Sequence, residues 1–455
     1  MGHADEVWWD ATCAALGDRR RARTLRRVRE RLQSHVGQSW SAALGSGLRQ
    51  AAGDLVALAS AGYRDMVAGD VAVTVARCAA LPWVIASDDT CAYDFTSQRG
   101  KQGMGRLRSK GRGVWGHSVL ALSPQGQVQG LLDTQFWTRQ GPALAGQRRA
   151  RDYAAKESRK WELSLERVQE LLPPGLVVVI VSDRESDIYR YIIAPRGAHV
   201  HLLLRLTHPR RLADSEQDLV TTARFAPVVG AGWIDVPAER GRPARQACVQ
   251  IRVSEVEVCS PRNGWSGPAS TVRLWVIAAR EENPPAGAKR LEWILASTRP
   301  VVSLADAWEG LRIYALRWQI EVLHRTLKKD GLRVERLQHK SALAVERALA
   351  IYQGVAADML HLVQVARADP ARPATDFLAS DALTVLALST RRPVTTIGQA
   401  VAAIAVLGGW PGHPRSPRPG VQVVSTGYHD LVVMVTGYRL ARGLPHGPVC
   451  YNDTG

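Results

Sequence analysis

The chain has 455 residues, with 59 Lys and Arg against 42 Asp and Glu, and a formal net charge of +17. This length predicts two or three domains with apolar cores, and the charge predicts a polyanionic partner, either nucleic acid or an anionic membrane surface. No apolar run of about 18 residues is evident and the N-terminal MGHADEVWWD lacks a signal-peptide pattern, so we expect a soluble cytoplasmic protein with no membrane partner.

The N-terminal segment, to about residue 70, has the apolar spacing of helices. Eight arginines lie between positions 19 and 31, and Gly17 and Asp18 precede them as a turn and a helix cap. So dense a run of charge is commonly a solvated helix face, but it also suits a helix laid along DNA phosphates. We therefore predict a helical DNA-binding domain over residues 1–70.

From about residue 80 the pattern changes to strands separated by loops rich in Gly, Arg and Lys, such as QRGKQGMGRLRSKGRG. A helical segment over 151–173, stopped by Pro173 and Pro174, precedes a β-branched strand. Three short apolar segments before that helix predict an antiparallel meander: 82–89, 114–123 and 128–139.

Two of the predicted strands end in aspartate. The segment PWVIASDDT reaches Asp88 and Asp89, and GLVVVIVSD reaches Asp183. A lone aspartate at a strand end is usually a turn residue or a helix N-cap, so each position alone is ambiguous. Together with a glutamate on a later helix, they predict the three converging carboxylates of a divalent metal site in an RNase H-like sheet.

That glutamate is Glu321, in the segment IYALRWQIEVLHRTLKK. Tyr314, Arg317, Glu321 and Lys328 fall within an arc of about 60° on one helix, away from the apolar face. The alternative is a solvated face with two charge pairs. Further β-type segments between Asp183 and this helix, at 199–206, 246–253, 271–279 and 291–298, predict a β-rich insertion at about 200–300. Helical alanine-rich sequence returns after about residue 335, and a last helical segment spans 395–409.

In its order of motifs the chain resembles the DDE transposases of bacterial insertion sequences, the group typified by the transposon five transposase. The helix quartet at this spacing is that group's signature. The other matching segments, in chain order, are ALGDRRR near the N-terminus, DDT, WGHSVL, KESRKW, SDRESDIYRY, THPRR, RPAR, EWIL and, more weakly, LGGW.

The resemblance implies an α/β fold: an RNase H-like catalytic domain over residues 71–360 with the β-rich insertion, and a helical C-terminal dimerisation domain over 361–455. It also implies that the catalytic, metal-binding triad is Asp89, Asp183 and Glu321, with Asp89 favoured over Asp88 because the family's acid directly precedes a threonine. Without the resemblance, Trp293 would be core packing. The expected DNA contacts are Tyr314, Arg317, Lys328, Trp293, Arg210, Arg20 and Arg21.

The implied function is cut-and-paste transposition. Two divalent ions, Mg²⁺ or Mn²⁺, suit a site of carboxylate oxygens, whereas the six scattered cysteines show no zinc-ligand spacing. The implied reactions are hydrolysis at the transposon ends, hairpin formation and strand transfer, and the implied partners are terminal inverted repeats, target DNA and a second copy of the chain at the bacterial nucleoid. Two alternatives stay open: another RNase H-like nuclease, and a non-catalytic DNA-binding regulator.

Overall fold

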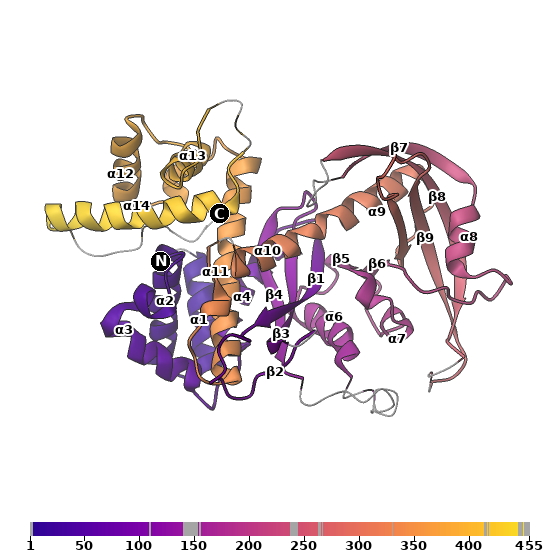
Figure 1. The fold of residues 1–455 in the computed structure, drawn as a ribbon, viewed down its shortest axis with the longest axis horizontal. Helices are drawn as coiled ribbons and strands as arrows, with labels where there is room; N and C mark the ends of the chain where they lie inside the picture. The colour runs from indigo at the N-terminus through magenta and orange to yellow at the C-terminus, as the bar shows by residue number, and fades with distance from the viewer. Residues whose placement is uncertain are drawn as a thin grey trace. The chain divides into compact units, whose positions relative to one another are not determined.

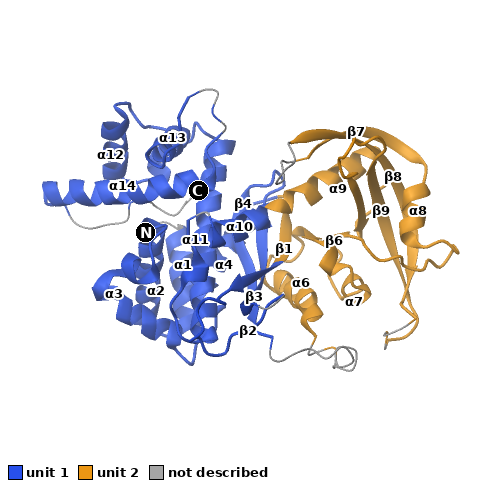
Figure 2. Cartoon of the chain, viewed as in Figure 1, with its two compact units in different colours: residues 1–81, 90–142, 319–455 blue, residues 82–89, 143–318 orange. Residues whose placement is uncertain are grey.

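The computed structural model describes residues 3–108, 111–139, 153, 156–236, 244–262, 265, 267–329, 331–413, 416, 418–444 and 449. The chain forms two compact units (Figure 2). Unit 1 contains residues 1–81, 90–142 and 319–455, and unit 2 contains residues 82–89 and 143–318. Unit 1 thus combines the N-terminal and C-terminal segments with strands from the middle of the chain, and the domain boundaries near 70 and 360 stay a prediction.

Unit 1 begins with helices α1 (His3–Leu16), α2 (Arg19–Ser34), α3 (Trp40–Ala57) and α4 (Ala68–Ala79). The predicted cap of α2 is confirmed, since the Asp18 carboxylate accepts a hydrogen bond from the Arg20 amide at 2.6 Å. The apolar face of α2 is buried, whereas most of its arginines are exposed or half-buried. Arg29 is the exception: its guanidinium is buried between Asp70 on α4 and Asp358, at 2.5 and 2.6 Å.

The second and third strands of the predicted meander pair in unit 1, whereas its first segment, 82–89, belongs to unit 2. Strand β3 (Arg112–Leu122) pairs antiparallel with β4 (Val128–Trp137) and with the short β2 (Gly105–Arg106). The end of β1 (Trp83–Asp94) also belongs to this unit. Helix α11 (Ala342–Ala368) packs on β4 (Figure 1). It also runs beside the N-terminal helices, although these are far from α11 in the sequence.

Helix α11 is long and apolar enough to cross a membrane by length and composition alone, although four charged residues interrupt it. The residues between Ala342 and Ala357 are almost all buried within the protein. Such a helix is what the core of a globular unit requires when it is surrounded on all sides. The long apolar run therefore belongs to the core of unit 1.

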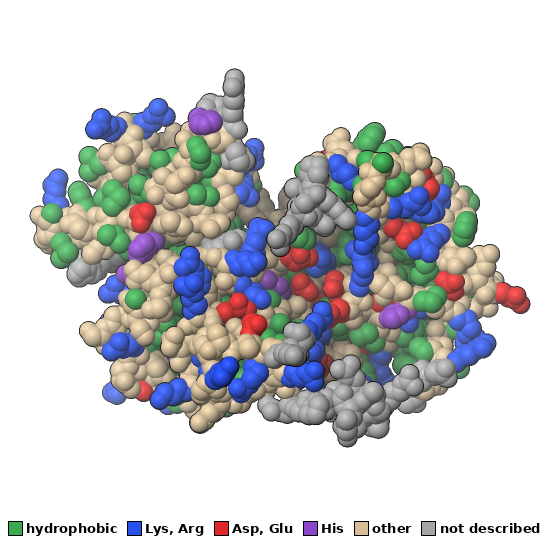
Figure 3. Space-filling model, in the orientation of Figure 1, with side chains coloured by type: hydrophobic (Ala, Val, Ile, Leu, Met, Phe, Trp, Pro, Cys, Tyr) green, Lys and Arg blue, Asp and Glu red, His purple; other side chains and the backbone are tan. Residues whose placement is uncertain are grey.

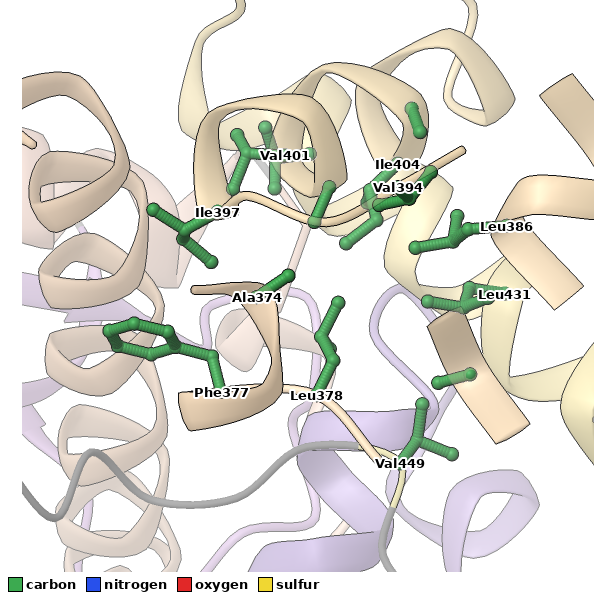
Figure 4. Packing of buried hydrophobic residues seen from close by; sticks show 14 of the residues in the cluster. Ala374, Phe377, Leu378, Leu386, Val394, Ile397, Val401, Ile404, Leu431 and Val449 are labelled. Carbon is green, nitrogen blue, oxygen red and sulfur yellow. The ribbon is translucent and has the colours of Figure 1, made fainter. Parts of the chain in front are cut away.

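The C-terminal part of unit 1 is helical, as predicted, and has a core of its own (Figure 4). It contains α12 (Ser380–Thr390), α13 (Ile397–Leu407) and α14 (Val421–Arg442). Phe377, Leu386, Ile404 and Leu431 are among its buried residues. Residues 445–448 and 450–455, which belong to the predicted dimerisation domain, lie outside the described part.

Unit 2 is built on a mixed sheet that begins with β1, β5 (Val177–Ser182) and β6 (Val200–Arg205), all parallel. Strand β10 (Glu292–Ser297) continues it antiparallel to β6, and β9 (Thr271–Glu281), β8 (Arg245–Cys259) and β7 (Val228–Val236) follow in that order. The predicted β-type segments correspond to β6, β8, β9 and β10, whereas β7 was not expected. The chain is thus a mixed α/β protein with a large mixed sheet.

The helices of unit 2 are α6 (Lys160–Leu171), α7 (Tyr189–Ile192), α8 (Leu219–Phe225) and α9 (Leu304–Leu316). Helix α6 corresponds to the later part of the helix predicted over 151–173. Of the earlier part, residues 151, 152, 154 and 155 lie outside the described residues.

A close crossing of α13 and α14 gives a test of the C-terminal packing. A Cβ added at Gly427 would lie 1.7 Å from the Ile404 carbonyl oxygen, so Gly427→Ala forces the two helices apart. We expect a loss of about 1–3 kcal/mol in the free energy of unfolding, measured by urea denaturation. Gly437→Ala on the same helix, with open space around the added Cβ, should stabilise the protein by about 0.5–1 kcal/mol. Equal effects of the two substitutions would contradict this packing.

Candidate active site

The register of two parallel strands brings Asp89 and Asp183 to equivalent positions. Ser87 on β1 is paired with Val181 on β5, and each aspartate follows two residues later. Strand β5 ends at Ser182, whereas β1 does not end at Asp89 as predicted but continues to Asp94. Because the two strands run parallel, both aspartates lie at the level where β5 ends. Asp183 is also the N-cap of the short helix Arg184–Ser186, where its Oδ1 accepts a hydrogen bond from the Glu185 amide at 2.8 Å. This capping contact uses Oδ1 of Asp183, and the predicted site role of this residue stays a prediction.

The neighbouring Asp88 has a different environment. Its residue is fully buried, whereas the side chain of Asp89 is 17% exposed. Burial raises the pKa of Asp88 well above its usual value, and the charges of Asp183 and Asp89 raise it further. A buried carboxyl that resists ionisation is a poor metal ligand, so Asp89 is the accessible acid of the pair.

Arg317 is the cation that faces these acids. Its Nη1 lies 3.8 Å from Asp89 Oδ2, and its backbone oxygen accepts a hydrogen bond from the Ser87 hydroxyl at 3.2 Å. Burial raises the pKa of Asp183. The hydrogen bond that its carboxylate accepts from the Glu185 amide and the positive charge of Arg317 both lower that pKa and so oppose the rise. Arg317 thus offsets the repulsion between two carboxylates at one sheet edge.

The single helix predicted for the quartet is wrong in one respect. Helix α9 ends at Leu316 and α10 (Trp318–Lys328) begins after Arg317, which joins them. The backbone of Arg317 keeps right-handed helical angles, φ −50° and ψ −30°, but its amide bonds to Tyr314 O, three residues back. This tighter turn interrupts the regular helical hydrogen bonding at the residue that contacts Asp89.

Tyr314 and Trp293 form an aromatic pair in unit 2. Their ring centroids are 5.3 Å apart with an interplanar angle of 67°, an edge-to-face contact. Tyr314 is buried, so it does not belong to an open polar stripe, and Trp293 on β10 is half-buried. The Arg317 guanidinium lies 5.8 Å from the Tyr314 ring centroid.

Glu321 and Lys328 lie on α10, in unit 1. The Lys328 ammonium donates to the Ala92 carbonyl oxygen at 2.8 Å and pairs with Glu335 at 3.0 Å. Glu335 also accepts a hydrogen bond from the Asp94 amide at 2.8 Å. Sequence reasoning missed Glu335, because its segment VERLQ has no chemical pattern and its partners on β1 are distant in sequence.

The three predicted acids divide between the units, with Asp89 and Asp183 in unit 2 and Glu321 in unit 1. Within the described part of the chain, no three His, Cys, Asp or Glu side chains form a group that could hold a metal ion. The pair on β1 and β5 nevertheless has the oxygen donors that Mg²⁺ and Mn²⁺ prefer. Its donor chemistry fits such an ion, and a third ligand has to come from elsewhere.

The other predicted DNA contacts have identifiable neighbours. Arg210 forms a buried ion pair with Asp187, and its Nε donates to Asp187 Oδ1 at 3.0 Å. This pair holds the segment after β6 in place, which is a structural role. On α2, Arg20 is exposed and Arg21 donates to the Leu16 carbonyl oxygen at 3.2 Å. DNA contact by these three arginines stays a prediction.

No protein-family model matches the chain. Among solved structures, it is similar to the piggyBac transposase in a cryo-EM synaptic complex with hairpin DNA, with a TM-score of 0.35 and 9% sequence identity. The match covers 84% of this chain and 62% of that one, so the chain spans less than two thirds of the piggyBac chain. We base no functional assignment on a similarity this distant.

The Lys328–Glu335 contact can be tested by a double-mutant cycle. Because both side chains are partly shielded from solvent, we expect Lys328→Met and Glu335→Gln to be coupled by about 0.5–1 kcal/mol in the free energy of unfolding. Lys329→Met, at the exposed next position, should be additive with Glu335→Gln. If the effects of Lys328→Met and Glu335→Gln on the free energy of unfolding were also additive, the contact would be refuted.

Proposed function

We propose that this protein is a DDE transposase of a bacterial insertion sequence, in the group typified by the transposon five transposase. One observation carries the proposal: Asp89 and Asp183 occupy equivalent positions on adjacent parallel strands, and Arg317, four residues before Glu321, faces them. The ordered motifs of that group along the sequence support it. In this proposal, an RNase H-like catalytic fold holds the acids.

The proposed cofactor is a pair of Mg²⁺ or Mn²⁺ ions held by Asp89, Asp183 and Glu321. When bound, such ions activate the attacking oxygen and stabilise the leaving oxygen of a phosphodiester. The chain's own residues bind and orient the DNA. Arg317 can donate two parallel hydrogen bonds to a phosphate, and in the structure it already lies beside the acid that the reaction needs.

Lys328 and Trp293 have supporting roles in the proposal. The Lys328 ammonium is held at the end of β1 by Ala92 and Glu335, so it is oriented before DNA arrives and can neutralise a neighbouring phosphate. Trp293 presents a half-buried indole whose position is set by Tyr314 behind it. We propose that this indole stacks on a base flipped out of the DNA end.

The proposed reaction course has four steps. Water nicks the transposon end, the freed 3′-OH attacks the opposite strand to form a hairpin, a second water reopens the hairpin, and the same 3′-OH attacks target DNA. The DNA partners are the terminal inverted repeats and the target, and two copies of the chain pair through their C-terminal helices. The proposed site of action is the bacterial nucleoid.

A direct test uses labelled DNA that carries the element's own terminal repeats, incubated with the full chain in Mg²⁺ or EDTA. We expect nicked and hairpin products only with Mg²⁺, and a rate lower by about 10²–10³-fold or more in Glu321→Gln and Asp183→Asn. Glu170→Gln, a matched change at an exposed ion pair, should cleave normally.

The two alternatives give different outcomes in the same assay. A nuclease of RNase H-like fold would show metal-dependent nicking that the acid variants abolish, without hairpins or joined target DNA. A regulator would bind the repeats tightly without cleaving them, whatever the metal or the variant. Either outcome would refute the transposase proposal.

A further inference from the structure

The short ribbon formed by β2 and the start of β3 places two arginines directly opposite each other. Arg106 is paired with Arg112 in antiparallel register, and both side chains are exposed. Neither forms an ion pair with an acidic residue in the described part of unit 1. Like charges at directly opposed positions destabilise a β-pair, so this ribbon is stabilised by any anion that lies between them.

Two further arginines flank the ribbon through Trp115. The Arg139 guanidinium lies 4.0 Å from the Trp115 ring centroid, and that of Arg108 lies 5.6 Å from it. The Trp115 indole donates to the Arg106 carbonyl oxygen at 3.2 Å, and the Arg106 amide donates to the Arg139 carbonyl oxygen at 2.9 Å. The four guanidinium groups are therefore attached to one hydrogen-bonded support.

Glycines allow this support to be tightly packed. A Cβ at Gly105 would lie 2.3 Å from the Arg139 amide nitrogen, and one at Gly113 would lie 1.9 Å from the Tyr93 carbonyl oxygen. Backbone segments can approach this closely only where side chains are absent. The ribbon is thus held close to its neighbours, and its arginines project from a fixed base.

The ribbon is linked by hydrogen bonds to Lys328. Arg112 donates its amide to the Thr96 hydroxyl at 2.9 Å, and the Thr96 amide donates to Asp94 Oδ1 at 2.8 Å. The Asp94 amide donates to Glu335, the partner of Lys328. Asp94 is an acid close to the ribbon, and its Oδ1 is engaged by Thr96. A polyanion that reaches Lys328 therefore has four more arginines within the same part of unit 1.

We propose that the ribbon, defined as residues 105–108, 112–113 and 139, binds the phosphodiester backbone of duplex DNA. Guanidinium groups can each donate two parallel hydrogen bonds to phosphate oxygens, which suits exposed arginines on a fixed base. The described residues of the ribbon include no exposed large apolar side chain that could insert into lipid. Lys and Arg side chains gather at this end of unit 1, where Figure 1 places β2 (Figure 3). Only the identity of the polyanion as DNA rests on the proposed function.

The test measures binding of the full chain to labelled duplex DNA by fluorescence anisotropy, in EDTA, over a range of salt concentrations. For the double variant R106Q/R112Q we expect weaker binding and a salt slope smaller by about 2, one unit for each lost phosphate contact. R106K/R112K should keep most of the slope, because it keeps the charge. Arg167→Gln, at an exposed ion pair on α6, should leave the slope unchanged.

Thermal melts of the double variant R106Q/R112Q and of its two single variants separate binding from folding. Arg106→Gln and Arg112→Gln should each leave the melting temperature unchanged or raise it, since each removes a like-charge repulsion. An unchanged salt slope in R106Q/R112Q would overturn the proposal. So would a slope that falls equally in R106Q/R112Q and in Arg167→Gln, because the effect would then not be specific to the ribbon. Because EDTA prevents metal-dependent cleavage, the result does not depend on whether the chain is a transposase.

Discussion

The parallel pairing of β1 with β5 is the constraint on which the candidate site depends. The paired residues of the two strands are almost all buried, and their register places Asp89 and Asp183 at equivalent positions, two residues beyond the Ser87–Val181 pair. A one-residue slip would exchange the faces of Asp88 and Asp89, so this register is what keeps the Asp88 carboxyl buried and the Asp89 carboxyl accessible. The apolar packing of two strands therefore decides which aspartate is accessible to a ligand.

Two carboxylates brought together in this way need a nearby positive charge, and Arg317 supplies it. The residue lies at the tightened turn between α9 and α10, where Ser87 of β1 holds its backbone oxygen. The same backbone feature that interrupts the helix thus fixes the guanidinium beside Asp89. The strand register thus fixes the positions of the two aspartates, and the helix junction fixes that of Arg317.

The excess of basic residues has more than one use in the fold. Arg29 and Arg210 are buried in ion pairs, and removal of either would leave a carboxylate without its cation. Lys328 is held by Glu335 at the end of β1, whereas Arg106 and Arg112 face each other without an acidic partner among the described residues. A net charge alone therefore does not distinguish arginines that stabilise the fold from arginines that are available to a polyanion.

The sequence by itself determined the features that depend on neighbouring residues: the Asp18 cap, the antiparallel pair of β3 and β4, the β-branched strand before Asp183 and the helical C-terminal part. Local hydrogen bonding and apolar periodicity are sufficient for these. Only the tertiary structure decided that α11 is a core helix, that Arg29 binds Asp358, 329 residues away, and that Glu335 holds Lys328. Burial and long-range pairing depend on which segments meet in space, and no short stretch of sequence contains that information.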